Sequence, residues 1–156
     1  MMTRPATPAD AGAMADLLNR IIAIGGTTAH ETPKSAETVR RDYIDGPATL
    51  TCVVAESGGR IIGWQAVGWH GAEAHIGSFV DPDVQAKGTG AQMFALTRSL
   101  CRERGLTEIF ATIRADNTPG LAYYARLGFA DIGAEPDYAL STGQVVGRIH
   151  RKLSLR

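Results

Sequence analysis

Val84-Gln85-Ala86-Lys87-Gly88-Thr89-Gly90-Ala91-Gln92-Met93-Phe94 is the stretch that decides the fold of this chain. Two glycines, two residues apart, precede an apolar run, which is typical of a turn that leads into a helix. Because glycine has no Cβ, ligand atoms can approach the main chain closely at Gly88 and Gly90. The first amides of a helix have no intrahelical partner, and the helix dipole adds a partial positive charge there. The stretch therefore predicts either a phosphate site or an ordinary glycine-rich turn before a core helix.

The same stretch lacks the defining residues of two common phosphate motifs. It is not a P-loop, because no Gly-Lys-Ser/Thr sequence follows. It is also a poor dinucleotide fingerprint, because Met93 stands where a third glycine belongs. Lys87 and the side chain of Gln85 could add contacts to a phosphate.

The composition predicts one soluble globular domain over residues 1–156, with 44% hydrophobic and 21% charged residues. Lys+Arg and Asp+Glu balance at 16 each, so we expect neither a nucleic-acid nor a membrane partner. The N-terminus does not resemble a signal peptide, and we interpret Cys52 and Cys101 as reduced, buried thiols of a cytoplasmic protein. The four histidines do not pair with each other or with cysteine at metal-ligand spacing, so we expect no metal.

Hydrophobic periodicity predicts an α+β order of elements on both sides of the opening stretch. Asp10 can cap the first helix, and Ser35 can cap a short second one. The two long helices should bury the apolar stripes Met14, Leu17, Leu18, Ile21 and Met93, Leu96, Leu100, Cys101. Helices are expected over 7–26, 35–44, 89–104 and 117–128, and strands over 48–56, 60–70, 74–80, 107–113, 129–134 and 144–155.

Two linked motifs sharpen the interpretation of the opening stretch. The first is Gln85-x-x-Gly88-x-Gly90, and the second is Asn117 followed by Tyr124-x-x-x-Gly128-Phe129. At this spacing the chain resembles the GCN5-related N-acetyltransferase family, well over residues 74–129 and in element order throughout. The resemblance implies a three-layer α+β fold with a mixed, mostly antiparallel sheet of six or seven strands and about four helices. Residues 19–38 also resemble, more weakly, the phosphinothricin (methionine sulfoximine) acetyltransferase branch.

The resemblance implies that acetyl-CoA is the cosubstrate. Backbone amides of Lys87, Gly88, Thr89, Gly90 and Ala91, with Gln85, would hold its pyrophosphate. Main-chain groups of Phe79 and Val80 would bind the pantetheine arm and the acetyl carbonyl, where an amide stabilises the developing oxyanion. Asn117 would bind the arm from the other side.

Tyr124 has two interpretations. The resemblance implies that its phenol protonates the departing CoA thiolate. Alternatively Tyr124 is a core residue, since Leu121, Tyr124 and Ala125 share one helical face.

The amine side of the reaction needs a base, because an amine with a pKa of about 10.4 is almost entirely protonated at neutral pH. The branch commonly places a glutamate on the strand before the glycine turn, and His75 holds that position here, which is a departure from the branch. Imidazole titrates near neutral pH and can act directly or through water. Glu73 is the competing candidate, and an ordinary surface histidine is the alternative.

The sequence shows no defining motif for the acceptor pocket. In this family the loop over residues 25–33 would shape it, so that Thr28, His30 and Glu31 join Glu73 and His75 as candidate substrate-binding residues. Trp64, Trp69 and Tyr43 could line the pocket or belong to the core.

The sequence thus predicts a cytoplasmic, acetyl-CoA-dependent N-acetyltransferase that acts on a small amine, either an amino acid or an analogue such as phosphinothricin or methionine sulfoximine. Transfer would be direct, within a ternary complex and without a metal, and a homodimer is possible. The alternatives are a protein or peptide N-acetyltransferase and a non-catalytic acyl-CoA-binding module on the same fold.

Overall fold

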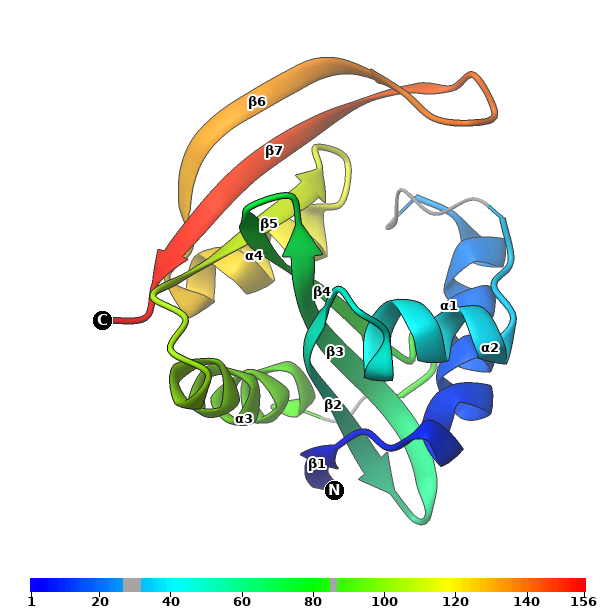
Figure 1. Cartoon of the computed structure of the whole chain (residues 1–156). Coiled ribbons are helices and arrows are strands. Elements are labelled where there is room, and N and C mark those ends of the chain that lie inside the picture. The colour runs from blue at the N-terminus through cyan, green and yellow to red at the C-terminus, as the bar shows by residue number, and fades with distance from the viewer. Residues whose placement is uncertain (27–31, 85–86) are drawn as a thin grey trace.

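A mixed β-sheet organises the molecule. The computed structural model describes residues 1–26, 32–84 and 87–156, which form seven strands in the order β1-β2-β3-β4-β5-β7-β6 (Figure 1). The β4–β5 pair is parallel and the other neighbours are antiparallel. The strands are β1 (Met2–Pro5), β2 (Thr49–Ser57), β3 (Arg60–His70), β4 (Glu73–Val80), β5 (Glu108–Arg114), β6 (Ala130–Ala139) and β7 (Val145–Ser154). The predicted α+β class and strand number are confirmed.

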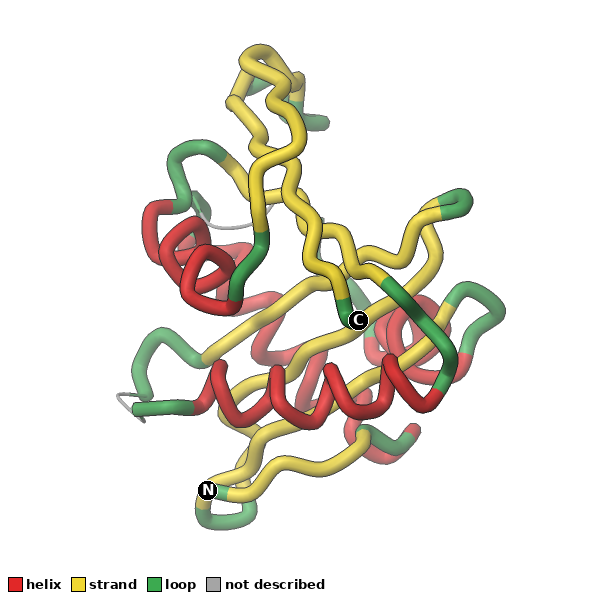
Figure 2. The backbone as a smooth tube through the Cα atoms, turned by 90° about the vertical axis from the view of Figure 1, so that its left-hand side faces the viewer, coloured by secondary structure: helices red, strands yellow, loops and turns green. Residues whose placement is uncertain are grey.

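Helices cover both faces of the sheet and complete three layers. On one face lie α1 (Ala11–Ile24) and α2 (Ala36–Val39), and on the other lie α3 (Thr89–Glu103) and α4 (Thr118–Leu127) (Figure 1). In Figure 2 α3 runs across the front of the strands. A 3-10 turn, η1 (Pro8–Asp10), precedes α1, and a π-helical segment, η2 (Arg40–Asp45), follows α2.

The first long helix buries the apolar stripe that periodicity predicts, and the second buries part of its predicted stripe. In α1, Met14, Leu17, Leu18 and Ile21 are all buried, as expected. In α3 the buried residues include Met93, Phe94, Thr97 and Cys101, while Leu96 and Leu100 are only half-buried. The α3 stripe is therefore rotated from the predicted one, because the helix contributes to two core clusters, one on β2 and β3 and one that extends over β3, β4, β5 and α4.

Two strand predictions needed correction. The first strand, β1, was not expected, because its four residues show no apolar alternation; it forms through antiparallel pairing with β2 at the sheet edge. The last hairpin is longer than predicted, since β6 continues to Ala139 through register shifts. Its two strands extend beyond the helices in Figure 1.

Both cysteines are free and buried, as predicted. Burial raises the pKa of Cys52 to about 12, so its thiolate is scarce at neutral pH. Among the helices that the structure describes, none is long and apolar enough to cross a membrane.

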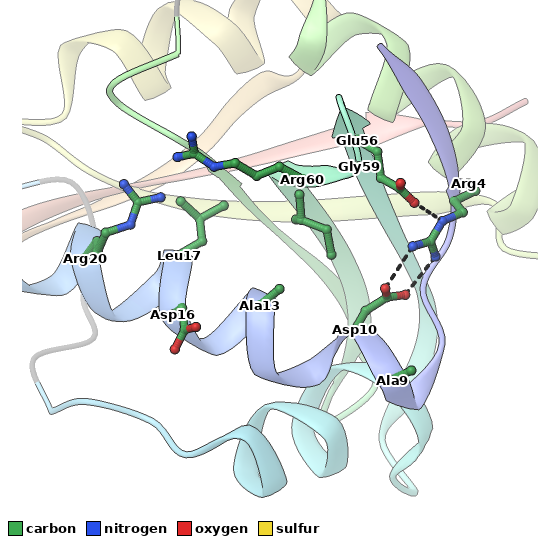
Figure 3. A pocket seen from close by; sticks show the side chains of 11 residues that line it. Arg4, Ala9, Asp10, Ala13, Asp16, Leu17, Arg20, Glu56, Gly59 and Arg60 are labelled. Atoms are coloured by element: carbon green, nitrogen blue, oxygen red, sulfur yellow. Dashed lines mark hydrogen bonds and ion pairs between the residues drawn. The ribbon is translucent and has the colours of Figure 1, made fainter.

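Asp10 links the N-terminal strand to the first helix. It occupies the N-cap position of α1 without capping that helix, because its carboxylate turns back to accept from the Thr7 amide at 2.8 Å. Arg4 donates to both carboxylate oxygens of Asp10 at 2.8 Å and also pairs with Glu56. The three charged side chains border a cavity of about 430 Å³ (Figure 3).

Removing the Asp10 charge should destabilise the protein. Hydrogen bonding by Arg4 lowers the pKa of Asp10 from 3.8 to about 2. The carboxylate therefore stabilises the fold above the pKa of the unfolded state, and this contribution disappears as pH falls from about 4 to about 2. Asp10→Asn should cost about 2 kcal/mol at pH 7 and should remove this acid-dependent loss, as measured by urea unfolding across pH. Asp16→Asn, an exposed carboxylate bordering the same cavity, is the control; equal effects of both variants would contradict the assignment.

Candidate active site

The strands β4 and β5 separate soon after they meet. Their register pair is His75↔Phe110, and no further pair joins them in the ranges that the structure describes. On its other side β4 stays paired with β3 as far as Val80↔Gly63. One edge of β4 is therefore without a strand partner from the middle of the strand onward.

Backbone alternation determines which β4 groups face that edge. The Asp81 amide donates to the Ile62 carbonyl at 2.8 Å, so every second residue back from Asp81 directs its main-chain groups toward β3. Ser78 and Val80 consequently direct theirs toward the side of β5. The predicted role of the Val80 amide fits this orientation. Main-chain groups of Phe79 face β3 instead, and its ring packs on Trp64 with centroids 4.4 Å apart.

The start of α3 supplies a second set of main-chain donors. Gly88 is its N-cap with φ of 84°, a left-handed conformation that favours glycine. The first intrahelical bond runs from the Gln92 amide to the Gly88 carbonyl at 2.9 Å, so the amides of Gly90 and Ala91 precede it. Lys87 is exposed beside this turn.

Gly90 is required for a reason that the sequence did not reveal. A Cβ at this position would lie 2.6 Å from the Tyr123 ring, whose hydroxyl donates to the Gly90 carbonyl at 2.8 Å. Close packing of α4 on α3 thus demands glycine whether or not a ligand is bound.

Tyr124 is both a core residue and a polar one. Its ring packs edge-on against Phe129 and Tyr123, and the side chain is buried. Its hydroxyl lies 2.8 Å from Ser78 Oγ, directly beside the unpaired edge of β4. Burial raises the pKa of Tyr124 above that of an ordinary phenol, and the hydrogen bond to Ser78 opposes this. The two interpretations of Tyr124 are therefore compatible.

Asn117 has a structural role of its own. It is the N-cap of α4, and its Oδ1 accepts from the Gly120 amide at 3.0 Å. Its predicted contact with the pantetheine arm stays a prediction.

The two competing base candidates form one pair. His75 Nε2 lies 3.1 Å from Glu73 Oε1, and the imidazole stacks on Phe110 at the point where β4 and β5 meet. The His70 ring is 4.8 Å away, and burial followed by the field of His75 lowers the pKa of His70. A base on β4 would thus lie where β4 meets β5, at the start of the unpaired edge, with a carboxylate to orient it.

Two of the remaining predicted residues lie on β3, four lie outside the described residues, and three residues beside the site were not predicted. Trp64 is a fully buried core residue under α1, while Trp69 is exposed near the C-terminal end of β3. Gln65, Ser78 and Tyr123 were not predicted, although a polar side chain within the apolar run of β3 was a signal for the first. Thr28, His30, Glu31 and Gln85 lie outside the described residues.

A model of the acetyltransferase (GNAT) family matches residues 17–129, which span the unpaired edge of β4, the start of α3 and Tyr124. The chain belongs to this family. The predicted resemblance is thereby confirmed. The described ranges of the chain contain no group of three or more His, Cys, Asp or Glu side chains that could hold a metal ion.

Curated relatives of this GNAT chain carry one name. A mycothiol acetyltransferase from Clavibacter michiganensis subsp. michiganensis is 31% identical over 113 residues, 68% of this chain and 37% of that protein. Another, from Clavibacter sepedonicus, is 36% identical over 93 residues, 59% of this chain and 30% of that protein. The chain thus spans about a third of the length of the relatives it matches.

Solved structures share the fold over the whole chain. A phosphinothricin acetyltransferase from Sinorhizobium meliloti in complex with AcCoA superposes with a TM-score of 0.83 at 18% identity, covering 98% of this chain and 87% of that one. A ribosomal-protein-alanine N-acetyltransferase from Brucella melitensis gives 0.84 at 20% identity, covering 99% of both chains. These neighbours act on different acceptors by name, so at such identity they establish the fold alone.

Gly90→Ala should destabilise the GNAT domain. The added Cβ would overlap the Tyr123 ring, and overpacking of this kind costs about 1–3 kcal/mol. Gly12→Ala is a matched control, because Gly12 is also the second residue of a long helix and a Cβ there meets nothing within 4 Å. Thermal unfolding should show a lower Tm for Gly90→Ala and an unchanged or higher Tm for Gly12→Ala. Equal Tm values for Gly90→Ala and the parent protein would refute the packing argument.

Proposed function

We propose that this protein is an acetyl-CoA-dependent N-acetyltransferase that transfers acetyl directly to the amine of a small molecule. One observation carries the proposal: the unpaired edge of β4 lies beside both the Tyr124 hydroxyl and the start of α3. Main-chain donors suited to an extended ligand, donors suited to an anion and a buried phenol would then belong to one site. Family membership and a neighbour in complex with AcCoA support the same donor.

The donor would be held by main-chain groups rather than by a basic surface. Amides at Gly90 and Ala91 would bind the pyrophosphate at the positive end of the α3 dipole. The pantetheine arm would occupy the unpaired edge of β4, where its amides replace those of a neighbouring strand. The Val80 amide would donate to the thioester oxygen and stabilise the negative charge that develops there.

Proton transfer would use one group on each side of the thioester. Tyr124 keeps its proton at neutral pH because burial raises the pKa of its phenol, so it can protonate the departing thiolate. The His75–Glu73 pair would take the proton from the attacking amine, directly or through water. Neither cysteine serves as a nucleophile, in keeping with direct transfer: both are buried, and burial raises the pKa of each thiol.

The acceptor is proposed as a small amine. Curated relatives are named for mycothiol and two solved neighbours for phosphinothricin, so amines of both kinds belong in a test panel. A cytoplasmic location and a homodimer complete the proposal.

The proposal is tested by CoA release from acetyl-CoA with a panel of amines. The panel comprises the mycothiol acetyltransferase acceptor, phosphinothricin, methionine sulfoximine, polyamines and peptides. Release that depends on a small amine, together with micromolar or tighter binding of acetyl-CoA by calorimetry, is expected. Release with peptides alone would favour a protein acetyltransferase, and binding without release would favour an acyl-CoA-binding module.

His75→Gln should alter the pH dependence of the reaction. A general base must be unprotonated, so the rate of the parent enzyme should rise with pH as the base loses its proton. The variant should lose this rise and should lose about 10²-fold in kcat near neutral pH. His70→Gln is the control, since it removes the neighbouring imidazole and should leave the rise in place. An unchanged profile in His75→Gln would assign the base elsewhere.

A further inference from the structure

We propose that Gln65, on β3, is a positioning residue for the acid Tyr124, acting through Ser78. The same amide also supports Tyr123, which anchors the start of α3. This inference rests on the proposed function, since it names the groups that make Tyr124 effective as an acid.

Tyr124 needs such support because of its own burial. A thiol has an ordinary pKa of about 8.5, whereas burial raises the pKa of this phenol above its usual value. Transfer of the phenol proton to a thiolate would therefore be unfavourable, and it would leave a buried phenolate. Hydrogen bonds donated to the phenolate oxygen lower this cost.

The hydrogen-bond network determines which atom of the Gln65 amide faces the two hydroxyls. Gln65 is fully buried, and its Nε2 lies 2.8 Å from Ser78 Oγ and 2.9 Å from Tyr123 Oη. Tyr123 has one proton and donates it to the Gly90 carbonyl, which can only accept. The oxygen of Tyr123 must then accept from Gln65. The amide nitrogen, with two hydrogens, is therefore the atom between Ser78 and Tyr123.

This arrangement leaves the Ser78 proton for Tyr124. Ser78 Oγ accepts from Gln65, and its own hydroxyl can donate to Tyr124 Oη across the 2.8 Å contact. The phenol proton is then free to point toward a leaving sulfur. With Ser78 as the donor to Tyr124, the hydrogen bonds run in one direction, from the Gln65 amide to Ser78 and from Ser78 to Tyr124.

The chemical step depends on a hydrogen bond that Ser78 donates to Tyr124. The amine nitrogen forms a bond to the acetyl carbon, the carbon–sulfur bond breaks, and the amine proton passes to the base or to water. The phenol proton of Tyr124 moves to sulfur and yields the CoA thiol. Ser78 donates a hydrogen bond to the phenolate, which regains a proton from solvent after CoA departs.

The second hydrogen of the Gln65 amide is donated to Tyr123, which has a structural role. Tyr123 packs its ring on Gly90 and donates to the Gly90 carbonyl, and neither contact involves Gln65. Removing the amide should therefore disturb the acid more than the donor-binding turn.

The test is a double-mutant cycle on kcat with acetyl-CoA and the best amine of the panel. Gln65→Met, an unbranched apolar replacement, should lower kcat by about 10-fold or more while the Kd for acetyl-CoA, from calorimetry, changes by less than about 3-fold. Tyr124→Phe should lower kcat by about 10²-fold. The double variant should lie within about 2-fold of Tyr124→Phe alone, because Gln65 affects the chemical step through the Tyr124 phenol.

Three further variants separate this role from a structural one. Ser78→Thr keeps the hydroxyl and should retain activity, whereas Ser78→Ala should match Gln65→Met. Thr97→Val is the matched core control: Thr97 is fully buried, and its hydroxyl has no hydrogen-bond partner among the described residues. It should leave kcat unchanged.

Multiplicative losses in the cycle, or full activity in Ser78→Ala, would overturn the inference and leave the proposed function standing. A parent protein that binds acetyl-CoA but releases no CoA with any amine would overturn the proposed function, and this inference with it.

Discussion

The separation of β4 from β5 is the constraint on which the rest of the structure depends. A strand edge inside a protein normally pairs with a neighbour, because an unpaired main-chain donor or acceptor is costly to bury. Here the register pair His75↔Phe110 joins the two strands, and the main-chain groups of Ser78 and Val80 face the side of β5 beyond it. A GNAT domain that leaves this edge open has a ready position for an extended ligand, and the start of α3 lies directly after it in the chain.

Several side chains fix the end of β4 in position. Asp81, the residue after β4, has a fully buried carboxylate that accepts from Arg20 at 2.7 Å and from Arg60 at 2.8 Å. The bond from Arg20 keeps the pKa of Asp81 below its usual range. On the other face, the Gln65 amide binds hydroxyls from β4 and α4. The end of β4 is therefore fixed from both faces of the sheet.

Much of the fold could be predicted because hydrophobic periodicity reports burial directly. The stripe of α1 and the meander from β2 to β4 follow from it, and the spacing from Gly88 to Tyr124 identified the family. The short strand β1 could not be predicted, since its structure comes from pairing with β2 rather than from its own residues. Gln65 was missed for a related reason: its importance lies in contacts with Ser78, 13 residues away, and with Tyr123, 58 residues away.

The sequence by itself determined the class of the domain and the spacing of its glycine and tyrosine motifs, because both depend on local spacing along helices and strands. Only the tertiary structure decided which neighbours those residues have. It showed that Gly90 is required by the ring of Tyr123, that His75 and Glu73 form one pair, and that Tyr124 is joined to a buried amide. The physical reason is that hydrogen bonding and steric contact act between neighbours in space, and these neighbours come from β3, β4, α3 and α4.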